Sequence, residues 1–198
     1  MDATEVFSPA EVGAVTGAPV RAVYKAAEER LPQQGLVRRG RRRLLTRWGA
    51  VCLAIDREMP RDVPLPVRRQ LYAGILTRQS AEPARCERGI LSYVVDVRAV
   101  ADRVDAELAR YRDAMALIVE DERVQGGAAT FRGTRILVHQ IASLSRQGAS
   151  EAELREDYPR LTSGMIAAAH IYARAHPRRG RPRKPVWRGG AEGERPGT

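Results

Sequence analysis

Residues 7–31 constrain the fold most, because they contain the start and stop signals of two short helices in close succession. Ser8 is followed three residues later by Glu11, which is the pattern of a capping box and predicts the start of a short helix. Gly17 then breaks that helix, and Pro19 begins a second one. Two short helices joined by a tight turn with glycine predict a helix-turn-helix, whose second helix fits the major groove of DNA.

The second of these helices is expected to have one apolar face and one basic face. Its apolar residues recur at spacings of three and four along the chain. They are Val20, Val23, Tyr24, Ala27 and Leu31. Arg21 and Lys25 lie four residues apart on the other face, so we expect these two side chains to address the DNA groove.

A basic hairpin is expected directly after the helix pair. Apolar pairs at positions 36–37 and 44–45 flank the sequence RRGRRR, in which Gly40 supplies the turn. The arginines at or beside its tip are Arg38, Arg39, Arg41, Arg42 and Arg43. This order of elements is that of a winged helix and resembles the DNA-binding heads of the MerR and excisionase type, which implies a hairpin along phosphates or the minor groove. The competing interpretation is an amphipathic helix pair with a solvated run of arginines.

The net charge of +10 is concentrated in two segments of the chain. Residues 36–48 contribute +6, and residues 176–198, with seven basic and two acidic groups, contribute +5, so the remainder sums to −1. Concentrated basic patches on an otherwise balanced chain favour contacts with polyanions over general solubility. Of the 34 basic residues 32 are arginine, which suits bidentate contacts to phosphate and guanine.

The head is expected to span residues 1–76. Two apolar helices, at residues 47–59 and 65–76, would complete its core. Residues 77–89 have the composition of turns and are expected to form a linker.

Residues 90–116 are expected to form a strand followed by a long helix that Asp96 caps. The helix carries an apolar stripe at spacings of three and four. The stripe consists of Val97, Val100, Ala101, Val104, Leu108, Tyr111 and Met115. Such a stripe either packs within the chain or forms a dimer seam, and the sequence leaves both open.

Residues 117–175 are expected to form a small unit of three helices behind a hairpin that turns at Gly133. Ser150 with Glu153 is a second capping box, and Thr162 caps the last helix. The chain is therefore expected to be mainly α with short β-hairpins: a winged helix-turn-helix, a tri-helical and helix-turn-helix-like domain, and a disordered basic tail at 176–198.

The sequence of this unit resembles a prokaryotic family long known only as a domain of unknown function. The shared pattern runs V-x-G-G, then F-R-G-T-R-I-x-V, and later Y-P-R-L-T. The positions that carry it include Gly133, Thr134, Arg135, Gly148, Tyr158 and Pro159. That family is similar to antitoxins of the VapB type, which are usually paired with PIN-like ribonuclease toxins. The resemblance therefore implies a protein that neutralises such a toxin.

These motif residues also have plain structural explanations. Gly133 permits a turn, Gly148 a left-handed helix cap, and Pro159 stops a helix. Arg135 is either a surface contact or a structural arginine, and both interpretations stay open. The unit has seven basic and seven acidic groups, so we expect the head to bind DNA and this unit to serve dimerisation or partner binding.

The basic tail has three possible roles. Its sequence RRGRPRKP resembles the AT-hook, whose Arg-Gly-Arg-Pro core lies in the minor groove of A·T-rich DNA. Alternatively, the arm occupies the acidic, magnesium-binding site of a PIN-like nuclease, with a large aromatic as its anchor. The residues expected to do so are Arg179, Arg181, Pro182, Arg183, Lys184 and Trp187. A solvated tail without fixed contacts is the third possibility.

Catalytic chemistry is not expected. The sequence has no Ser-His-Asp order, no glycine loop of the phosphate-binding type and no metal-ligand spacing, so we expect neither an enzyme nor a cofactor or metal. Cys52 and Cys86, the latter placed in a loop, are expected to be unpaired thiols. No signal peptide or membrane-length apolar run is present, and we expect a cytoplasmic protein.

Together these features predict a homodimeric antitoxin that represses its own operon by binding double-stranded operator DNA and neutralises a PIN-like ribonuclease. The alternative is a stand-alone transcription regulator whose tail makes a second DNA contact. A scaffold without DNA binding is the third class, and it differs in predicting no salt-sensitive shift of promoter DNA.

Overall fold

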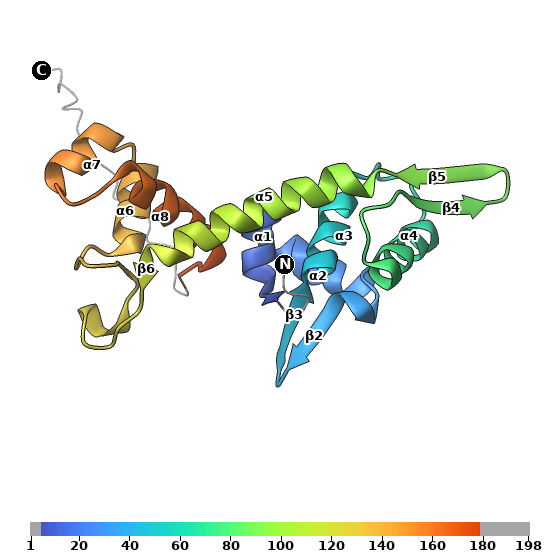
Figure 1. Ribbon diagram of the computed structural model, residues 1–198, viewed down its shortest axis with the longest axis horizontal. Helices are drawn as coiled ribbons and strands as arrows, with labels where there is room; N and C mark the ends of the chain where they lie inside the picture. The colour runs from blue at the N-terminus through green and yellow to red at the C-terminus, as the bar shows by residue number, and fades with distance from the viewer. Residues whose placement is uncertain (1–4, 179–198) are drawn as a thin grey trace, which may run out of the picture.

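The computed structural model describes residues 5–178, and this part of the chain is mostly helical with a few short antiparallel strand pairs. Figure 1 shows an elongated molecule in which one long helix joins two units. In the first unit the helices are α1 (Pro9–Thr16), α2 (Val20–Glu29), α3 (Arg47–Glu58) and α4 (Leu65–Arg78), with a 3-10 turn at Gln33–Gly35. Its strands are β1 (Val6–Phe7), β2 (Leu36–Arg39), β3 (Arg42–Thr46), β4 (Ala84–Arg88) and β5 (Leu91–Val95).

The start of the chain folds as its capping signals predict. The Glu11 N–H donates to Ser8 Oγ at 3.3 Å and the Ser8 N–H donates to Glu11 Oε2 at 2.5 Å, which confirms the capping box of α1. Gly17 ends α1 with a φ of +67°, a left-handed conformation that glycine adopts without strain. Helix α2 follows directly, so the short helix pair is confirmed.

The buried face of α2 differs from the expected one at Tyr24. Val23, Ala26 and Ala27 are buried, whereas Tyr24 is 53% exposed. The buried stripe is centred between Val23 and Ala27, and Tyr24 lies at the edge of this narrow stripe.

The basic segment forms the expected hairpin. Strand β2 pairs antiparallel with β3, Gly40 has a φ of +59° in the turn, and β1 adds to the other side of β3 to give the order β1-β3-β2. Leu45 is fully buried and anchors the base of the hairpin, while the arginine-bearing end points away from the body of the molecule (Figure 1).

The expected linker at residues 77–89 is wrong. Helix α4 continues to Arg78, and residues 84–88 form strand β4, which pairs with β5. Ala84 and Cys86 alternate with exposed neighbours and are buried, so Cys86 lies in a strand and not in a loop. Strand β4 packs against α4, which lies earlier in the chain. Its own sequence has only two buried side chains, too few for an alternating pattern to predict a strand.

Helix α5 (Val97–Ala116) begins at Asp96, whose Oδ1 accepts from the Ala99 N–H at 3.2 Å, as expected. The apolar stripe of α5 is buried within the chain, except for the half-buried Met115. It packs against α3 and α1 of the first unit and against α8 of the second. Of the two uses of this stripe that the sequence left open, the structure shows the intramolecular one.

The second unit contains strands β6 (Ile118–Val119) and β7 (Thr130–Phe131), a 3-10 turn at Gln125–Gly127, and helices α6 (Val138–Arg146), α7 (Glu151–Asp157) and α8 (Ser163–Ala175). The chain turns at Gly133 as expected, with a φ of +73°, but β7 pairs with β6, and after the turn only an isolated bridge forms to Leu137. The second capping box, Ser150 with Glu153, and the Thr162 cap of α8 are confirmed.

The described residues have two hydrophobic cores. The first runs from Phe7 to Tyr111 and includes Ala175, and the second lies among α6, α7, α8 and the end of α5. A head that closes at residue 76 is therefore too short, because β4, β5 and most of α5 share its core. None of the helices in residues 5–178 combines the length and apolar character that crossing a membrane requires.

Candidate nucleic-acid interface

The exposed side of α2 carries the two groups expected to face DNA. Arg21, Lys25 and Glu28 follow at spacings of four and three, which places them on one side of the helix. Arg21 has no ion pair among the described residues, and Lys25 Nζ lies 4.0 Å from Glu29 Oε2. An exposed pair of this kind contributes at most about 1 kcal/mol, so Lys25 is readily available to another anion.

Strand pairing in the hairpin places arginines directly opposite other arginines. Its register sets Arg38 opposite Arg43 and Arg39 opposite Arg42, with Arg41 in the turn. Like charges directly opposite each other destabilise a pair of strands. Two successive arginine pairs therefore make the hairpin a site that gains stability from an external polyanion.

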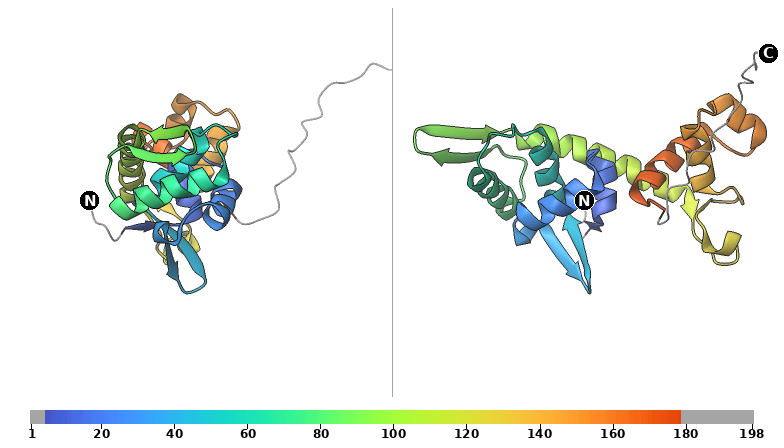
Figure 2. Two further views of the ribbon diagram at one scale, coloured as in Figure 1. Left: turned by 90° about the vertical axis from the view of Figure 1, so that its right-hand side faces the viewer. Right: turned by 180° about the vertical axis from the view of Figure 1, so that it is seen from behind.

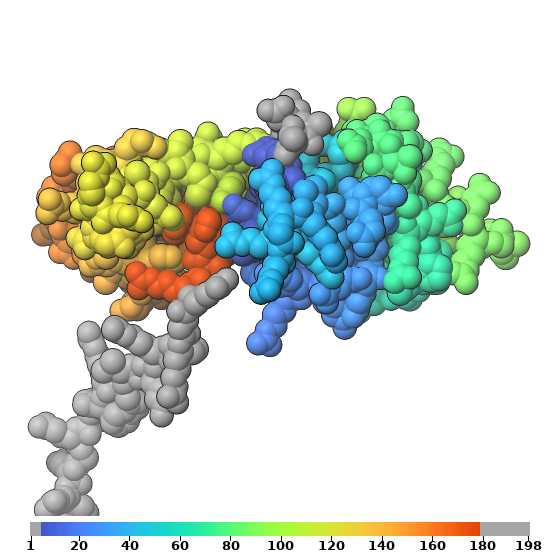
Figure 3. All heavy atoms as spheres, turned by 90° about the horizontal axis from the view of Figure 1, so that it is seen from below, coloured from blue at the N-terminus to red at the C-terminus, as the bar shows by residue number. Residues whose placement is uncertain are grey.

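The hairpin and α2 form one continuous surface. Arg43 Nη1 lies 3.3 Å from Glu28 Oε1, which joins the face of α2 to the arginine-bearing strand. Seen from below in Figure 3, the light-blue atoms of the hairpin face the viewer beside the darker blue atoms of α2. The structure thus places the predicted residues on two adjoining elements, Arg21 and Lys25 on α2 and Arg38, Arg39, Arg41, Arg42 and Arg43 on the hairpin, which the contact between Arg43 and Glu28 joins.

Arg47 belongs to the interior, although it lies in the most basic stretch of the sequence. Its guanidinium makes two hydrogen bonds to the carboxylate of Asp105 and lies 4.3 Å from the ring centroid of Trp48. The two bonds to Asp105 hold α3 against α5. One of the six positive charges in residues 36–48 is therefore neutralised within the fold.

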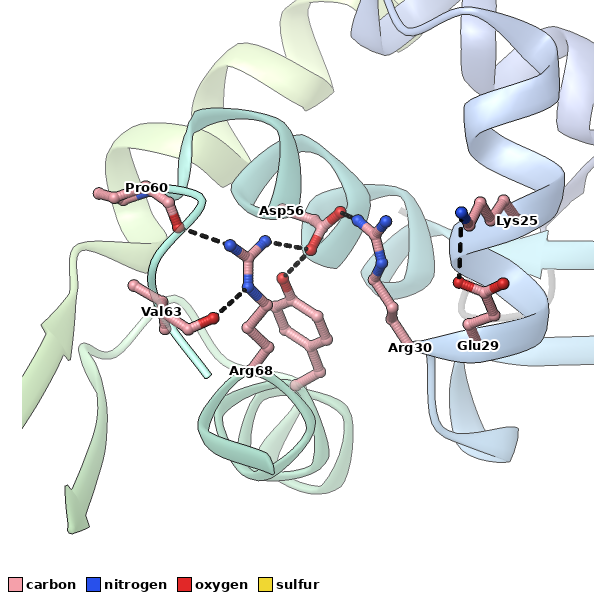
Figure 4. A network of polar contacts seen from close by, with 8 residues as sticks. Lys25, Glu29, Arg30, Asp56, Pro60, Val63 and Arg68 are labelled. Carbon is pink, nitrogen blue, oxygen red and sulfur yellow. Dashed lines mark hydrogen bonds and ion pairs between the residues drawn. The ribbon is translucent and has the colours of Figure 1, made fainter. Parts of the chain in front are cut away.

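A network of ion pairs and hydrogen bonds joins the end of α2 to α3 and α4 (Figure 4). Asp56 of α3 accepts from Arg30 at the end of α2, from Arg68 Nη1 at 3.0 Å and from the Tyr72 hydroxyl at 2.8 Å. Arg68 also donates to the carbonyls of Pro60 and Val63. Burial, followed by the nearby Asp56 carboxylate, raises the pKa of Tyr72, so its hydroxyl stays protonated and donates.

Sequence reasoning missed this network. Its signal in the sequence is weak, because Asp56 and Arg68 each stand at the border between an apolar run and further polar residues of α3 and α4. Buried charges are kept when they are paired, so two such residues on neighbouring helices could have been proposed as partners.

A second network joins the two units of the molecule. The Tyr111 hydroxyl donates to Glu11 Oε1 at 2.6 Å and lies 3.3 Å from His176 Nε2. The ring of His176 stacks on Tyr172, with centroids 4.3 Å apart, and the Tyr172 hydroxyl donates to Glu120 at 2.6 Å. Residue 176 therefore belongs to the fold, and the expectation that the tail begins there is wrong.

The family-motif residues hold turns and helix ends. The Thr134 hydroxyl donates to the Phe131 carbonyl at 2.9 Å and accepts from the Ile136 N–H at 3.1 Å, which closes the turn at Gly133. Gly148 has a φ of +103° after α6, and Tyr158 ends α7 just before Pro159.

Arg135 differs from its neighbours in the motif. Its side chain is exposed and has no hydrogen bond or ion pair within residues 5–178. Of the two interpretations that the sequence left open, a surface position is the one that the structure shows.

The tail residues expected to bind a toxin lie outside the described residues. They are Arg179, Arg181, Pro182, Arg183, Lys184 and Trp187. Within the described part of the chain, no group of three or more His, Cys, Asp or Glu side chains is arranged to hold a metal ion. Cys52 and Cys86 are buried and unpaired with each other, and burial raises the pKa of the Cys52 thiol, which keeps it protonated.

The second unit of this chain is similar to a known protein family. Residues 118–173 match the family described as "Protein of unknown function (DUF433)". The chain is also 34% identical over 87 residues to the uncharacterized protein y4eO of Sinorhizobium fredii (strain NBRC 101917 / NGR234). That match covers 44% of this chain and 38% of the relative, so the shared part is well under half the relative's length. No solved structure matches the chain.

Proposed function

We propose that this protein is an antitoxin of a type II toxin-antitoxin system, which binds operator DNA through its first unit and neutralises a PIN-like ribonuclease through its second unit and tail. The observation that carries the DNA-binding part is the joined surface of α2 and the hairpin, with its two arginine pairs. The resemblance of residues 117–175 to the VapB-like family supports the toxin-binding part.

In this proposal α1 and α2 act as a helix-turn-helix and the β2–β3 hairpin acts as its wing. Arg21 and Lys25 enter the major groove, while the hairpin arginines neutralise phosphates beside it or in the minor groove. The Asp56 network fixes α2 to α3 and α4, so that the helix keeps its angle to the hairpin when DNA is bound.

The DNA-binding part is tested with the variant Arg39→Thr/Arg42→Thr. We expect weaker binding to the protein's own promoter, and a plot of log affinity against log salt concentration that is shallower by roughly 0.9 for each phosphate that the variant no longer neutralises. The matched control is Arg98→Thr/Arg155→Thr, which removes two exposed arginines outside this surface and outside the β4–β5 hairpin. Equal affinity and salt dependence for both variants would contradict the proposed surface.

The toxin-binding part is tested by ribonuclease inhibition with the product of the neighbouring gene. A chain ending at Arg178 keeps the His176 contact of the second unit and lacks the rest of the tail. Partial or lost inhibition assigns toxin docking to the tail, whereas full inhibition assigns it to the second unit. If the full-length chain neither inhibits nor binds that product, the stand-alone regulator is the correct function.

A further inference from the structure

Three of the five large apolar side chains that are exposed in residues 5–178 lie on one hairpin. The large apolar residues with exposed side chains in the described part are Tyr24, Leu65, Ile90, Leu91 and Val94. Ile90 is fully exposed at the turn between β4 and β5, and Leu91 and Val94 are each 57% exposed. Figures 1 and 2 show this hairpin extending beyond the rest of the molecule, at the end far from the second unit.

The outer edge of β5 is unprotected. In the described part of the chain β5 pairs only with β4, in a sheet of two strands. Edge strands usually carry charged residues or proline, which prevent pairing with another chain. The sequence of β5, LSYVV, has neither. A further strand on this edge would add backbone hydrogen bonds to the outward-facing groups of β5.

A groove adjoins the base of the same strand. Two neighbouring cavities of about 330 and 300 Å³ share Met59, Pro60, Val94 and Val95 as lining residues. Acidic residues lie on the lining of these cavities as well. They are Glu58, Asp62 and Asp96. Glu58 pairs with Arg103, whereas Asp62 has no ion pair among the described residues.

The tip of the hairpin offers this groove apolar side chains and a cation. Ile90 and Leu91 are apolar, and the neighbouring Arg88 is exposed and has no ion pair in the described part of the chain. The tip thus carries apolar residues with Glu87 and Arg88 beside them, and the groove is apolar with a net negative lining of Glu58, Asp62, Asp96 and Arg103, so that Arg88 of one copy can approach the acidic groups of the other. Each copy of the chain has one tip and one groove. Two copies can therefore exchange the same contact twice, as in a two-fold symmetric dimer.

Strand geometry brings the two surfaces together. If β5 of two copies pairs antiparallel about Ser92, Leu91 of each copy lies opposite Tyr93 of the other, and the turn that carries Ile90 lies beside Val94 of the other copy. The tip lies about 13 Å from the groove along its own strand, because a strand rises about 3.3 Å per residue. Antiparallel pairing therefore delivers each tip to the groove of the other copy.

We propose that the protein forms a two-fold symmetric dimer through the β4–β5 hairpin, in which the two β5 edges join to make a four-stranded sheet and each tip enters the other copy's groove. The apolar stripe of α5 is buried within the chain and is not free to serve as the seam. The proposal deepens the proposed function by naming the surface that pairs two DNA-binding units. Only the purpose of the dimer rests on the proposed function. The dimer itself is tested without DNA or a toxin, so the two proposals can fail separately.

The test measures the mass of the full-length chain by sedimentation velocity over a range of concentrations. We expect a dimer for the wild type, and for Ile90→Glu/Val94→Glu a dissociation constant at least about tenfold higher. Both side chains are exposed in one copy, and Glu at position 94 would face Arg85 across the hairpin, so the variant should fold normally. The matched control Tyr24→Glu/Leu65→Glu changes two exposed apolar residues elsewhere and should remain a dimer. A monomeric wild type, or an unchanged mass for the hairpin variant, would overturn the proposal.

A cross-link gives a second readout. Ser92→Cys places a new exposed thiol at the symmetry axis, while the native Cys52 and Cys86 are buried. Cα atoms of directly opposed residues are about 4.5 to 5.5 Å apart, within reach of a disulfide. We expect oxidation to give a covalent dimer, and Ile90→Glu/Val94→Glu in the same chain to abolish it. A chain that stays monomeric on oxidation contradicts the pairing about Ser92.

Discussion

At the scale of single residues, the fold depends on a few charged side chains that form ion pairs with one another at the core. Asp56 accepts hydrogen bonds from Arg30, Arg68 and Tyr72, and so ties together three helices of the first unit. Because Arg68 is itself buried, removal of its carboxylate leaves a cation in the interior without a counterion. The whole network therefore depends on Asp56.

The first prediction concerns Asp56→Ala. We expect the free energy of unfolding to fall by about 3 to 5 kcal/mol, the usual cost of breaking a buried pair by removing one partner. Chemical denaturation monitored by circular dichroism measures this loss. Asp102→Ala removes an exposed carboxylate on α5 that has no ion pair in the described residues, and should change the stability little. Similar losses for the two variants would show that the network is unimportant.

The second prediction concerns His139. Burial lowers its pKa, and the neighbouring charges of Arg178, His176 and Arg146 lower it further. A histidine with a lower pKa in the folded state binds fewer protons there than in the unfolded chain, so stability is lost as the pH falls through the unfolded value of about 6.5. We therefore expect a lower melting temperature at acidic pH, and His139→Gln should reduce that fall.

The control for this experiment is His170→Gln, which leaves His139 in place. It should keep the loss of stability at acidic pH, although it removes the contact between His170 Nε2 and Ser145 Oγ. If His139→Gln retained the full pH dependence, the burial of His139 would not be its cause.

At the scale of secondary-structure elements, the β2–β3 hairpin carries opposed arginines that lower its stability and that we propose to bind DNA. Its base is fixed by the buried Leu45, whereas its outer end faces solvent with arginines opposed across the strands. Such pairs cost stability unless an anion lies between or beside them. An element that is strained by its own charge is well suited to bind a polyanion.

The third prediction follows from these pairs. Arg39→Thr/Arg42→Thr replaces two opposed cations with a favourable cross-strand pair and should raise the free energy of unfolding by about 0.2 to 1 kcal/mol. The same variant should bind promoter DNA more weakly, so stability and affinity change in opposite directions. Thermal melts at low salt measure the first effect. A destabilised variant would contradict the role assigned to charge repulsion.

At the scale of the whole molecule, helix α8 connects the two units. It packs against α1 and α5 as well as against α6. The hydroxyl of Tyr111 links Glu11 of α1 to His176 after α8, and burial followed by the Glu11 hydrogen bond raises the pKa of Tyr111. The same Glu11 caps α1, so the junction reaches the first helix of the first unit.

The fourth prediction concerns Tyr111→Phe, which removes this hydroxyl and keeps the ring. We expect a loss of about 1 to 3 kcal/mol in the free energy of unfolding, because the variant loses a hydrogen bond to the half-buried carboxylate of Glu11. Hydrogen exchange should increase in α1 and at the end of α8. Tyr158→Phe, whose hydroxyl accepts from Gln140 at an exposed position, serves as the matched control. Equal exchange in both variants would show that the junction does not couple the units.

Local signals in the sequence predicted much of the fold. Capping boxes at Ser8 and Ser150 and the turn at Gly40 each depend on a few neighbouring residues, and each is present in the structure. Strand β4 and the exposure of Tyr24 could not be predicted in this way, because both depend on helices that lie far away in the chain.

The candidate DNA surface follows the same division. The sequence by itself determined where the arginines gather and which helices and turns hold them, because helix caps, glycine turns and charge are local properties. Tertiary structure decided that Arg47 is neutralised by Asp105, that the stripe of α5 is buried inside the chain, and that His176 packs between the units. These outcomes depend on contacts between distant residues, and only the packed chain brings such residues together.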